Sequence, residues 1–258
     1  MRRPYDSGVS RHRGVELAAA IVGSVLVLAA LVIIWAARST ITRDVYVSEM
    51  GAPGQPTASW FQLSLVFIAA GGALVAYAGR DIRSRLRILR AWAPSVSIWI
   101  GCALFLLTSQ VTCTAGCPIP IGIGFTWQDF VHTTAAVLAF AAACWGMLQT
   151  SFSVGRRALS AFSLASAISV ALIAGAGGLF SLFNFQANLG SRLELIATTI
   201  ALAWLLVLGV FASARLISPP GPATPLLGSE ADSRAGHHPE PARPPVSSPA
   251  EPQPSVRP

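Results

Sequence analysis

Two ionisable residues stand close together at the start of an apolar stretch, where charged side chains are rare. His132 follows Asp129 by three positions, so a helix places both side chains on one face. A carboxylate beside an imidazole favours the charged imidazole and fixes its orientation. An ionisable group at membrane depth normally faces the bundle interior or water. The pair is compatible with a proton relay, with a site for a polar headgroup, or with a bond that only locks two helices together.

Four further polar residues are candidates for the same site. Ser48 and Glu49 lie in the loop after the first apolar stretch, and Arg192 and Glu194 lie at the entry to the last one. We expect Arg192 to pair with Asp129 or Glu49, or to contact a phosphate. Together with His132, these residues form a hypothetical ligand site at one face of the membrane.

Helix capping is a simpler role for the acids. At three places a hydroxyl residue stands three positions before an acid or amide, the pattern of a capping box. These places are Ser59 with Gln62, Thr126 with Asp129, and Ser191 with Glu194. In that role, Asp129 and Glu194 satisfy backbone N–H groups and complement the helix dipole. Three helix N-termini on one face also favour an anionic ligand, so both roles stay open.

Cys113 and Cys117 share a loop that also contains two prolines. If this loop lies outside the cell, the pair is expected to close a small ring as a disulfide, because disulfides persist there. A stabilising role is favoured over redox catalysis, whose motif is C-x-x-C. Cys102 and Cys144 fall inside apolar stretches, as is typical of small core residues.

Several kinds of catalytic site lack support in the sequence. The apolar part of the chain has one histidine and no second ligand at helical spacing, whereas a zinc site needs three or four ligands. We find no G-x-S-x-G, Walker or dinucleotide-binding motif. We therefore assign no metal, no cofactor and no catalytic residue.

Membrane-spanning helices must position these residues. The chain is 53% hydrophobic and 11% charged, against about a quarter charged in soluble domains. About 20 apolar residues span the hydrocarbon core as a helix. We expect an all-α membrane protein with six transmembrane helices in one bundle, over residues 17–37, 60–78, 91–110, 130–148, 159–183 and 193–217.

The chain divides into three regions. A basic N-terminus covers residues 1–14, the six-helix domain covers 15–217, and a tail covers 218–258. The tail has 12 prolines among its 41 residues and few apolar side chains. Such a segment cannot bury enough surface to offset its ordering entropy, so we expect it to be disordered.

The positions of the arginines predict the orientation. All 18 basic residues are arginine, and 15 of them fall on the side that holds both termini. The positive-inside rule places both termini in the cytoplasm and the cysteine loop outside. The net charge of +7 comes from arginines in short loops, which contact anionic lipids, so we predict no nucleic-acid partner. The expected location is the plasma membrane of a bacterium.

Three stretches carry a family resemblance. The segment YVSEMGAPGQPTASWF (46–61) resembles the "S-E-l-g…g…F" segment of the bacterial domain-of-unknown-function family 998. The helix DFVHTTAAVLAF (129–140) resembles the family's "H-x-x-x-A-x-x-x-F" helix. GSRLE (190–194), ahead of Ala203-Trp204, is similar to its "G-x-x-E-R" and Trp, except that Arg192 precedes the acid.

This resemblance implies a fold but no activity. Members of the family are six-helix membrane proteins, distantly similar to the Frag/DRAM/Sfk group, some of which are linked to lipid organisation. The resemblance adds weight to Ser48, Glu49 and His132 as parts of one outer-face site.

We therefore expect a non-enzymatic membrane protein with a polar pocket just under its outer surface. Its partners would be membrane lipids, with a lipid headgroup or a small anion bound in the pocket. One alternative is a membrane-embedded enzyme that acts on lipid, with His132 as general base and Asp129 orienting it. A proton-coupled transporter is the other alternative.

Overall fold

Six α-helices make up most of the chain that the structure describes. The structure, a computed structural model, describes residues 5–115, 117–118, 124–153, 157–183 and 187–218. The helices are α1 (Tyr5–Ser39), α2 (Ala58–Ala78), α3 (Pro94–Gln110), α4 (Trp127–Ser151), α5 (Arg157–Leu182) and α6 (Ala187–Ile217), with a short 3-10 helix η1 (Ser48–Gly51). The predicted all-α, six-helix fold is confirmed.

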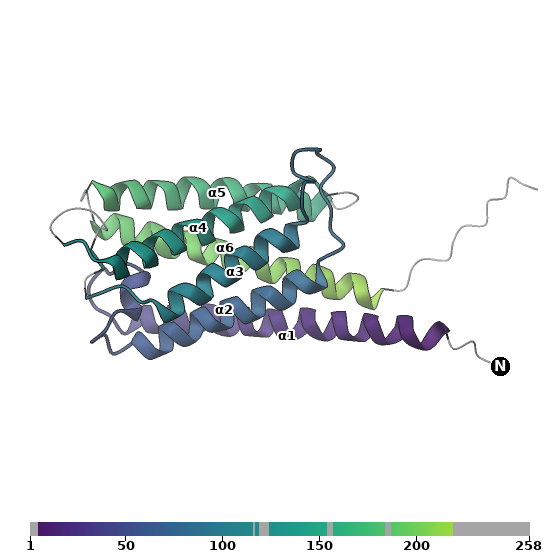
Figure 1. The fold of residues 1–258 in the computed structure, drawn as a ribbon, viewed down its shortest axis with the longest axis horizontal. Helices are drawn as coiled ribbons and strands as arrows, with labels where there is room; N and C mark the ends of the chain where they lie inside the picture. Colours follow the sequence, from purple (N-terminus) through teal and green to yellow (C-terminus); the bar gives the residue numbers. More distant parts are fainter. Residues whose placement is uncertain (1–4, 116, 119–123, 154–156, 184–186, 219–258) are drawn as a thin grey trace, which may run out of the picture. The chain divides into compact units, whose positions relative to one another are not determined.

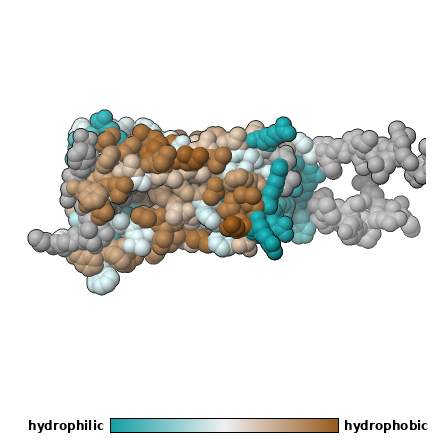
Figure 2. Space-filling model, turned by 90° about the horizontal axis from the view of Figure 1, so that it is seen from above, coloured by the Kyte–Doolittle hydropathy of each residue, from teal (hydrophilic) through white to brown (hydrophobic). Residues whose placement is uncertain are grey.

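These helices have the length and composition of membrane spans. Five of them are long and apolar enough to cross a membrane, while α3 is a shorter apolar helix of 17 residues. Figure 2 shows a broad apolar surface along the helices, bounded by a band of hydrophilic side chains at the end where α2 and α3 are joined. The chain is therefore a multi-pass membrane protein.

The helices lie side by side, antiparallel to their neighbours in sequence (Figure 1). Each helix packs against the next one along the chain, and α1 also packs against α6. Contacts between α2 and α6 join the two halves of the bundle. This arrangement brings η1 and the loop before α4 to the same end of the bundle as the entry to α6 (Figure 1).

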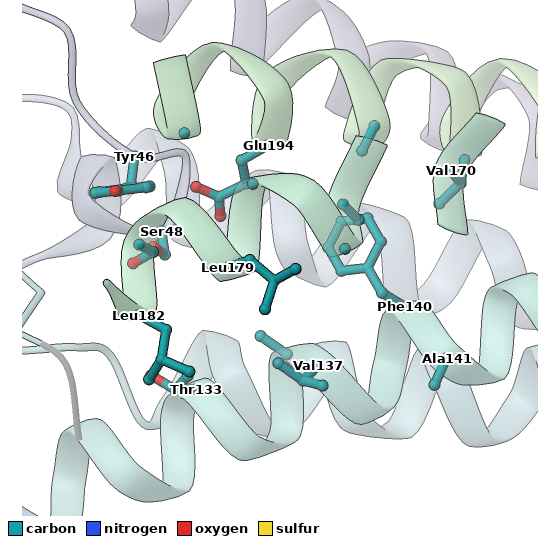
Figure 3. A pocket seen from close by; sticks show the side chains of 18 of the residues that line it. Tyr46, Ser48, Thr133, Val137, Phe140, Ala141, Val170, Leu179, Leu182 and Glu194 are labelled. Atoms are coloured by element: carbon teal, nitrogen blue, oxygen red, sulfur yellow. The ribbon is translucent and has the colours of Figure 1, made fainter. Parts of the chain in front are cut away.

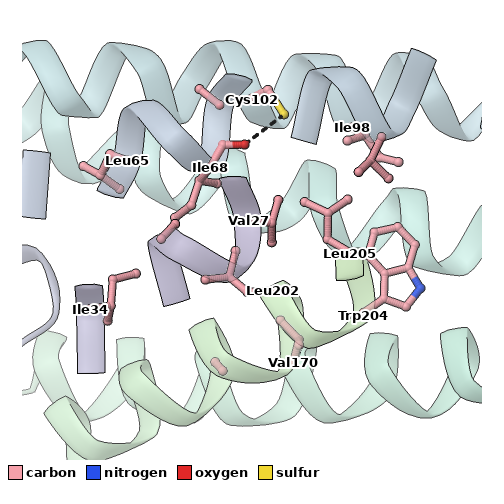
Figure 4. Close-up of a cluster of buried hydrophobic side chains, with 14 of the residues drawn as sticks. Val27, Ile34, Leu65, Ile68, Ile98, Cys102, Val170, Leu202, Trp204 and Leu205 are labelled. Atoms are coloured by element: carbon pink, nitrogen blue, oxygen red, sulfur yellow. Dashed lines mark hydrogen bonds between the residues drawn. The ribbon is translucent and has the colours of Figure 1, made fainter. Parts of the chain in front are cut away.

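A cluster of apolar side chains from several helices fills the centre of the bundle. Val27, Ile68 and Leu205 are among its buried members, and Figure 4 shows them facing one another across α1, α2 and α6. Trp204 is 2% exposed, and its indole N–H donates to Ser163 Oγ at 2.9 Å. This bond satisfies the polar atom of a buried tryptophan and joins α6 to α5.

Two helices begin at residues other than those expected. α1 starts at Tyr5, so the predicted basic segment 1–14 is largely helical. The guanidinium of Arg13 donates to Leu216 O and Ser218 O, so this part of α1 is bonded to the end of α6. α3 starts at Pro94 rather than Ala91, since proline has no N–H to bond and suits the first helical turn. The predicted tail lies outside the described residues from 219 onward.

Two of the three expected capping boxes are wrong. α2 begins after Thr57, so Ser59 already lies inside the helix. Ser191 also lies inside a helix, since α6 begins at Ala187, and its hydroxyl donates to Asn188 O. Thr126 does cap α4, because its side chain accepts the backbone N–H of Asp129. The sequence pattern alone does not say where the preceding turn ends.

A glutamine anchors the loop between α2 and α3. Gln149 Nε2 donates to the carbonyls of Leu89 and Trp92 at 3.1 and 2.9 Å, and its Oε1 accepts from Ser97 Oγ. Gln149 is 1% exposed, so these bonds replace water for a buried amide. This loop, which holds five arginines, is therefore fixed to α3 and α4.

α1 and α2 approach each other closely at two glycines. A Cβ atom on Gly23 would lie 2.7 Å from the carbonyl oxygen of Gly71, and a Cβ on Gly71 would lie 2.7 Å from that of Gly23. Small residues allow this kind of backbone approach between membrane helices. Because the obstacle is backbone on both sides, a side chain there forces the helices apart.

We predict that Gly23→Ala destabilises the bundle by about 1–3 kcal/mol, the usual cost of an extra methyl group in a packed core. Thermal unfolding of the purified protein, followed by tryptophan fluorescence, measures the change. Gly14→Ala is the matched control, since it lies on the same helix and its Cβ would meet nothing within 4 Å. Equal melting temperatures for Gly23→Ala and the wild type would contradict the prediction.

Candidate functional site

A cavity of about 650 Å³ lies among α4, α5 and α6. Its walls are mainly apolar, with Val137 and Phe140 from α4 and Val170 and Leu179 from α5 (Figure 3). Polar side chains gather at one end only. They are Tyr46, Ser48, His132, Thr133, Ser181 and Glu194, joined by the sulfur of Cys117. The cavity therefore has a long apolar part and a polar end beneath η1.

Small residues on α5 leave room for this cavity. Gly175 and Gly178 line it, and a Cβ on either would meet no atom within 4 Å. Gly177 also lines the cavity but packs against α6, where its Cβ would lie 3.3 Å from Leu193 Cβ. One glycine thus permits close packing on α6, while the other two leave space toward α4.

His132 lines the polar end and is held by a backbone carbonyl. Its Nδ1 lies 2.6 Å from Val111 O. A carbonyl can only accept, so Nδ1 carries the proton and Nε2 remains an acceptor in the neutral ring. The side chain is 4% exposed. The expected orienting bond from Asp129 to His132 is therefore replaced by one from His132 to the end of α3.

Glu194 comes to the polar end from α6. Its Oε2 accepts the backbone N–H of Val47, at the start of η1, at 2.9 Å. Figure 3 shows the carboxylate beside Tyr46 and Ser48. The expected capping role is wrong, because Glu194 lies two turns inside α6 and accepts from a segment 147 residues away.

The two loop cysteines are joined in a disulfide, with their Cα atoms 5.1 Å apart. Cys113 is fully buried, while Cys117 lines the cavity. Cys117 has a φ of 43°, which is uncommon for a residue with a side chain. Both sulfurs and one nitrogen of His132 lie within 4.8 Å of one another. Because sulfurs in a disulfide offer no thiolate, this cluster is not a metal site in the disulfide form.

Asp129 fixes the loop before α4 and does not line the cavity. Its Oδ1 accepts the backbone N–H of Thr114 at 2.7 Å, and its Oδ2 accepts the hydroxyls of Thr114 and Thr126. The side chain has no exposed surface. Three donors satisfy a buried carboxylate without an arginine, so Asp129 holds this loop in place.

The arginines of this end pair with acids outside the cavity. Arg43 donates to Glu49 at 2.6 Å, and Arg192 donates to Asp44 at 3.0 Å. Arg38 donates to the other oxygen of Asp44 at 2.7 Å. The expected pairing of Arg192 with Asp129 or Glu49 is therefore wrong. Asp44 was not selected from the sequence, and it pairs with both Arg38 and Arg192.

The structure thus brings together half of the residues selected from the sequence. Ser48, His132 and Glu194 line the cavity, whereas Glu49, Asp129 and Arg192 do not. Tyr46 and Thr133 were missed, although both lie within two residues of a selected one. The apolar wall was missed because its residues have the composition of any membrane-spanning helix.

A family comparison matches residues 11–211 to the family described as Protein of unknown function (DUF998). The chain belongs to this family. The resemblance found in the sequence is therefore confirmed, and the match covers α2 to α5 and most of α1 and α6. Neither the curated proteins nor the solved structures contain a match. The DUF998 family model names no activity, so the cavity is the basis for a functional proposal.

We predict a pH-dependent contribution of Asp44 to stability. The hydrogen bond from Arg192, with the charge of Arg38, lowers the pKa of Asp44 below 3.8. A carboxyl whose pKa is lower in the folded state stabilises the fold above its ordinary pKa and loses this effect as the pH falls through the folded value. The melting temperature of Asp44→Asn should therefore be lower than that of the wild type at pH 7, and the gap between the two should shrink below about pH 3.8.

Thermal unfolding between pH 7 and pH 3 measures this difference. Asp81→Asn is the control, because it removes the same charge at the other end of the bundle, where Asp81 faces Arg215 at 3.9 Å. A difference between Asp44→Asn and the wild type that stays constant across this range would contradict the assignment.

Proposed function

We propose that this DUF998 protein binds an amphipathic, lipid-like molecule in the cavity among α4, α5 and α6. The two-part lining of the cavity is the observation that carries the proposal. An alkyl chain lies along the apolar walls of α4 and α5, and a polar head meets Tyr46, Ser48, His132 and Glu194. A volume of about 650 Å³ falls within the usual range of ligand sites.

The polar residues at this end of the cavity favour a role in binding a ligand head over a purely structural role in helix packing. A carboxylate and an imidazole at membrane depth are costly, and such groups usually face a cavity or a partner. Here both line the same cavity, and the α1–α2 loop covers them through the bond from Val47 to Glu194. A ligand head that bonds with them recovers part of the solvation lost on burial.

An amphiphile fits better than the small anion considered from the sequence. An anion needs a cation, yet Arg43 and Arg192 are paired with Glu49 and Asp44. The enzyme alternative also loses support, because His132 Nδ1 donates to Val111 O and not to Asp129, whose oxygens accept from Thr114 and Thr126. Binding of an uncharged or cationic amphiphile requires neither a free arginine nor a bond between Asp129 and His132.

We also propose that the polar end faces outside the cell, in a bacterial plasma membrane with both termini in the cytoplasm. The arginine-rich loop, with Arg83, Arg85 and Arg87, lies at the opposite end of the bundle from η1 (Figure 1). The positive-inside rule assigns such a loop to the cytoplasm. The disulfide then lies on the oxidising side, where it persists.

We predict that filling the cavity removes binding. Gly178→Leu places a side chain in space that is open at its Cβ, and it should weaken binding of monolaurin, a neutral twelve-carbon probe, by about tenfold or more. Native mass spectrometry of the protein in a non-ionic detergent, titrated with monolaurin, measures the bound fraction.

Ala165→Leu is the matched control for this experiment. Ala165 is exposed on the same helix and does not line the cavity, so its variant should bind monolaurin like the wild type. Melting temperatures show that both variants are folded. Unchanged binding by folded Gly178→Leu and by folded Ala174→Phe, which also targets the lining, would overturn the proposed function.

A labelling experiment tests the orientation. In a chain with Cys102 and Cys144 changed to alanine, Cys117 is the half-exposed thiol released by reduction. A membrane-impermeant maleimide added to intact, reduced cells should label it without lysis. Labelling that requires lysis would place the disulfide in the cytoplasm and reverse the orientation.

A further inference from the structure

Among the acids whose side chains the structure describes, most are paired with arginine. Glu16 bonds Arg80, Asp44 bonds Arg38 and Arg192, Glu49 bonds Arg43, and Asp81 faces Arg215. Two acids make no such pair, Asp129 and Glu194. The difference between these two acids indicates what the cavity accepts.

Asp129 is satisfied without a cation. Both of its oxygens accept hydrogen bonds from the loop that it anchors, and no part of it is exposed. It also stands in the first turn of α4, where the helix N-terminus favours a carboxylate. Nothing further is needed to stabilise this charge.

Glu194 differs in its position and in its surroundings. It lies two turns inside α6, away from the helix end, and it lines the cavity. It accepts the backbone N–H groups of Val47 and Ser48, and no ion pair joins it to the part of the chain that the structure describes. A carboxylate at this depth is stabilised by an opposite charge, and the cavity is where that charge can enter.

An aromatic ring stands at the same end. Tyr46 lines the cavity, and Figure 3 shows its ring beside the carboxylate of Glu194. A carboxylate next to an aromatic ring suits an ammonium group, because the ring face attracts cations. Neighbouring Ser48 and His132 supply oxygen and nitrogen acceptors.

We infer that the amphiphile bound in this cavity carries a cationic nitrogen at its head, which pairs with Glu194 and lies against Tyr46. This inference rests on the proposed function and narrows it from lipid-like molecules to those with an ammonium group near the alkyl chain. The apolar walls hold the chain, and the polar end recognises the charge.

Three probes with the same twelve-carbon chain test the head. Dodecyltrimethylammonium is cationic, monolaurin is neutral and laurate is anionic. By native mass spectrometry of the full-length protein, we expect wild type to bind the ammonium probe most tightly and laurate least. Glu194→Gln should weaken binding of the ammonium probe by about tenfold or more and weaken binding of monolaurin by much less, because it removes the charge and keeps the shape.

Asp81→Asn removes one negative charge far from the cavity and should leave all three affinities unchanged. If Glu194→Gln does not fold, Tyr46→Leu replaces it, with an expected loss of about threefold or more for the ammonium probe alone. Equal binding of ammonium and laurate by the wild type, or an unchanged preference in the folded variant, overturns the inferred head. If the wild type binds none of the three probes, the proposed function itself is contradicted.

A second arm separates two sources of the ammonium group. The protein is placed in lipid discs made of phosphatidylethanolamine or of phosphatidylglycerol, and dodecyltrimethylammonium is added to each. Weaker probe binding in phosphatidylethanolamine identifies a membrane lipid amine as the occupant. Equal binding in both identifies a free cationic amphiphile, and stronger binding in phosphatidylethanolamine contradicts recognition of the amine.

Discussion

The hydrogen bond from Val47 to Glu194 determines how the functional end of this protein is built. It joins the loop after α1 to α6 across 147 positions of sequence. Together with the hydroxyl of Thr57, which donates to Met50 O, this bond holds η1 above the cavity, where Tyr46 and Ser48 line the same end as His132. Non-helical backbone at the edge of a membrane must find its own donors and acceptors. Here one carboxylate accepts from the loop and also faces the cavity, so the support of the loop and the chemistry of the site depend on the same residue.

The cavity requires a second condition, which is that α5 does not fill the space facing α4. Glycines at 175 and 178 meet this condition, while Gly177 lets α5 approach α6. Elsewhere the same residue type serves the opposite purpose, since Gly23 and Gly71 bring α1 and α2 into backbone contact. The bundle is therefore tightly packed between α1 and α2 and leaves open space beside α5, where we propose that the ligand binds.

Hydropathy was enough to predict the helices, because six stretches of sufficient length must each satisfy their backbone internally. It was not enough to place their ends. Ser59 and Ser191 match the capping pattern but lie inside their helices, since Thr57 precedes α2 and α6 already begins at Ala187. For the same reason Glu194 was expected to close a helix, although its carboxylate bonds to another segment.

The partners of the charged residues were harder to predict than the helices, and the reason is geometric. Asp129 and Arg192 belong to the same end of the bundle, and sequence offers no means to choose between Asp129, Glu49 and Asp44 as the partner of Arg192. The structure decides by proximity: Asp44 takes Arg192, and the threonines take Asp129. Among the described residues, the arginines of this end each bond to Asp44 or Glu49, and none bonds to Glu194. An apolar cavity that ends at an unpaired carboxylate selects a cation, so the charge preference follows from the pairing of residues that never touch the ligand.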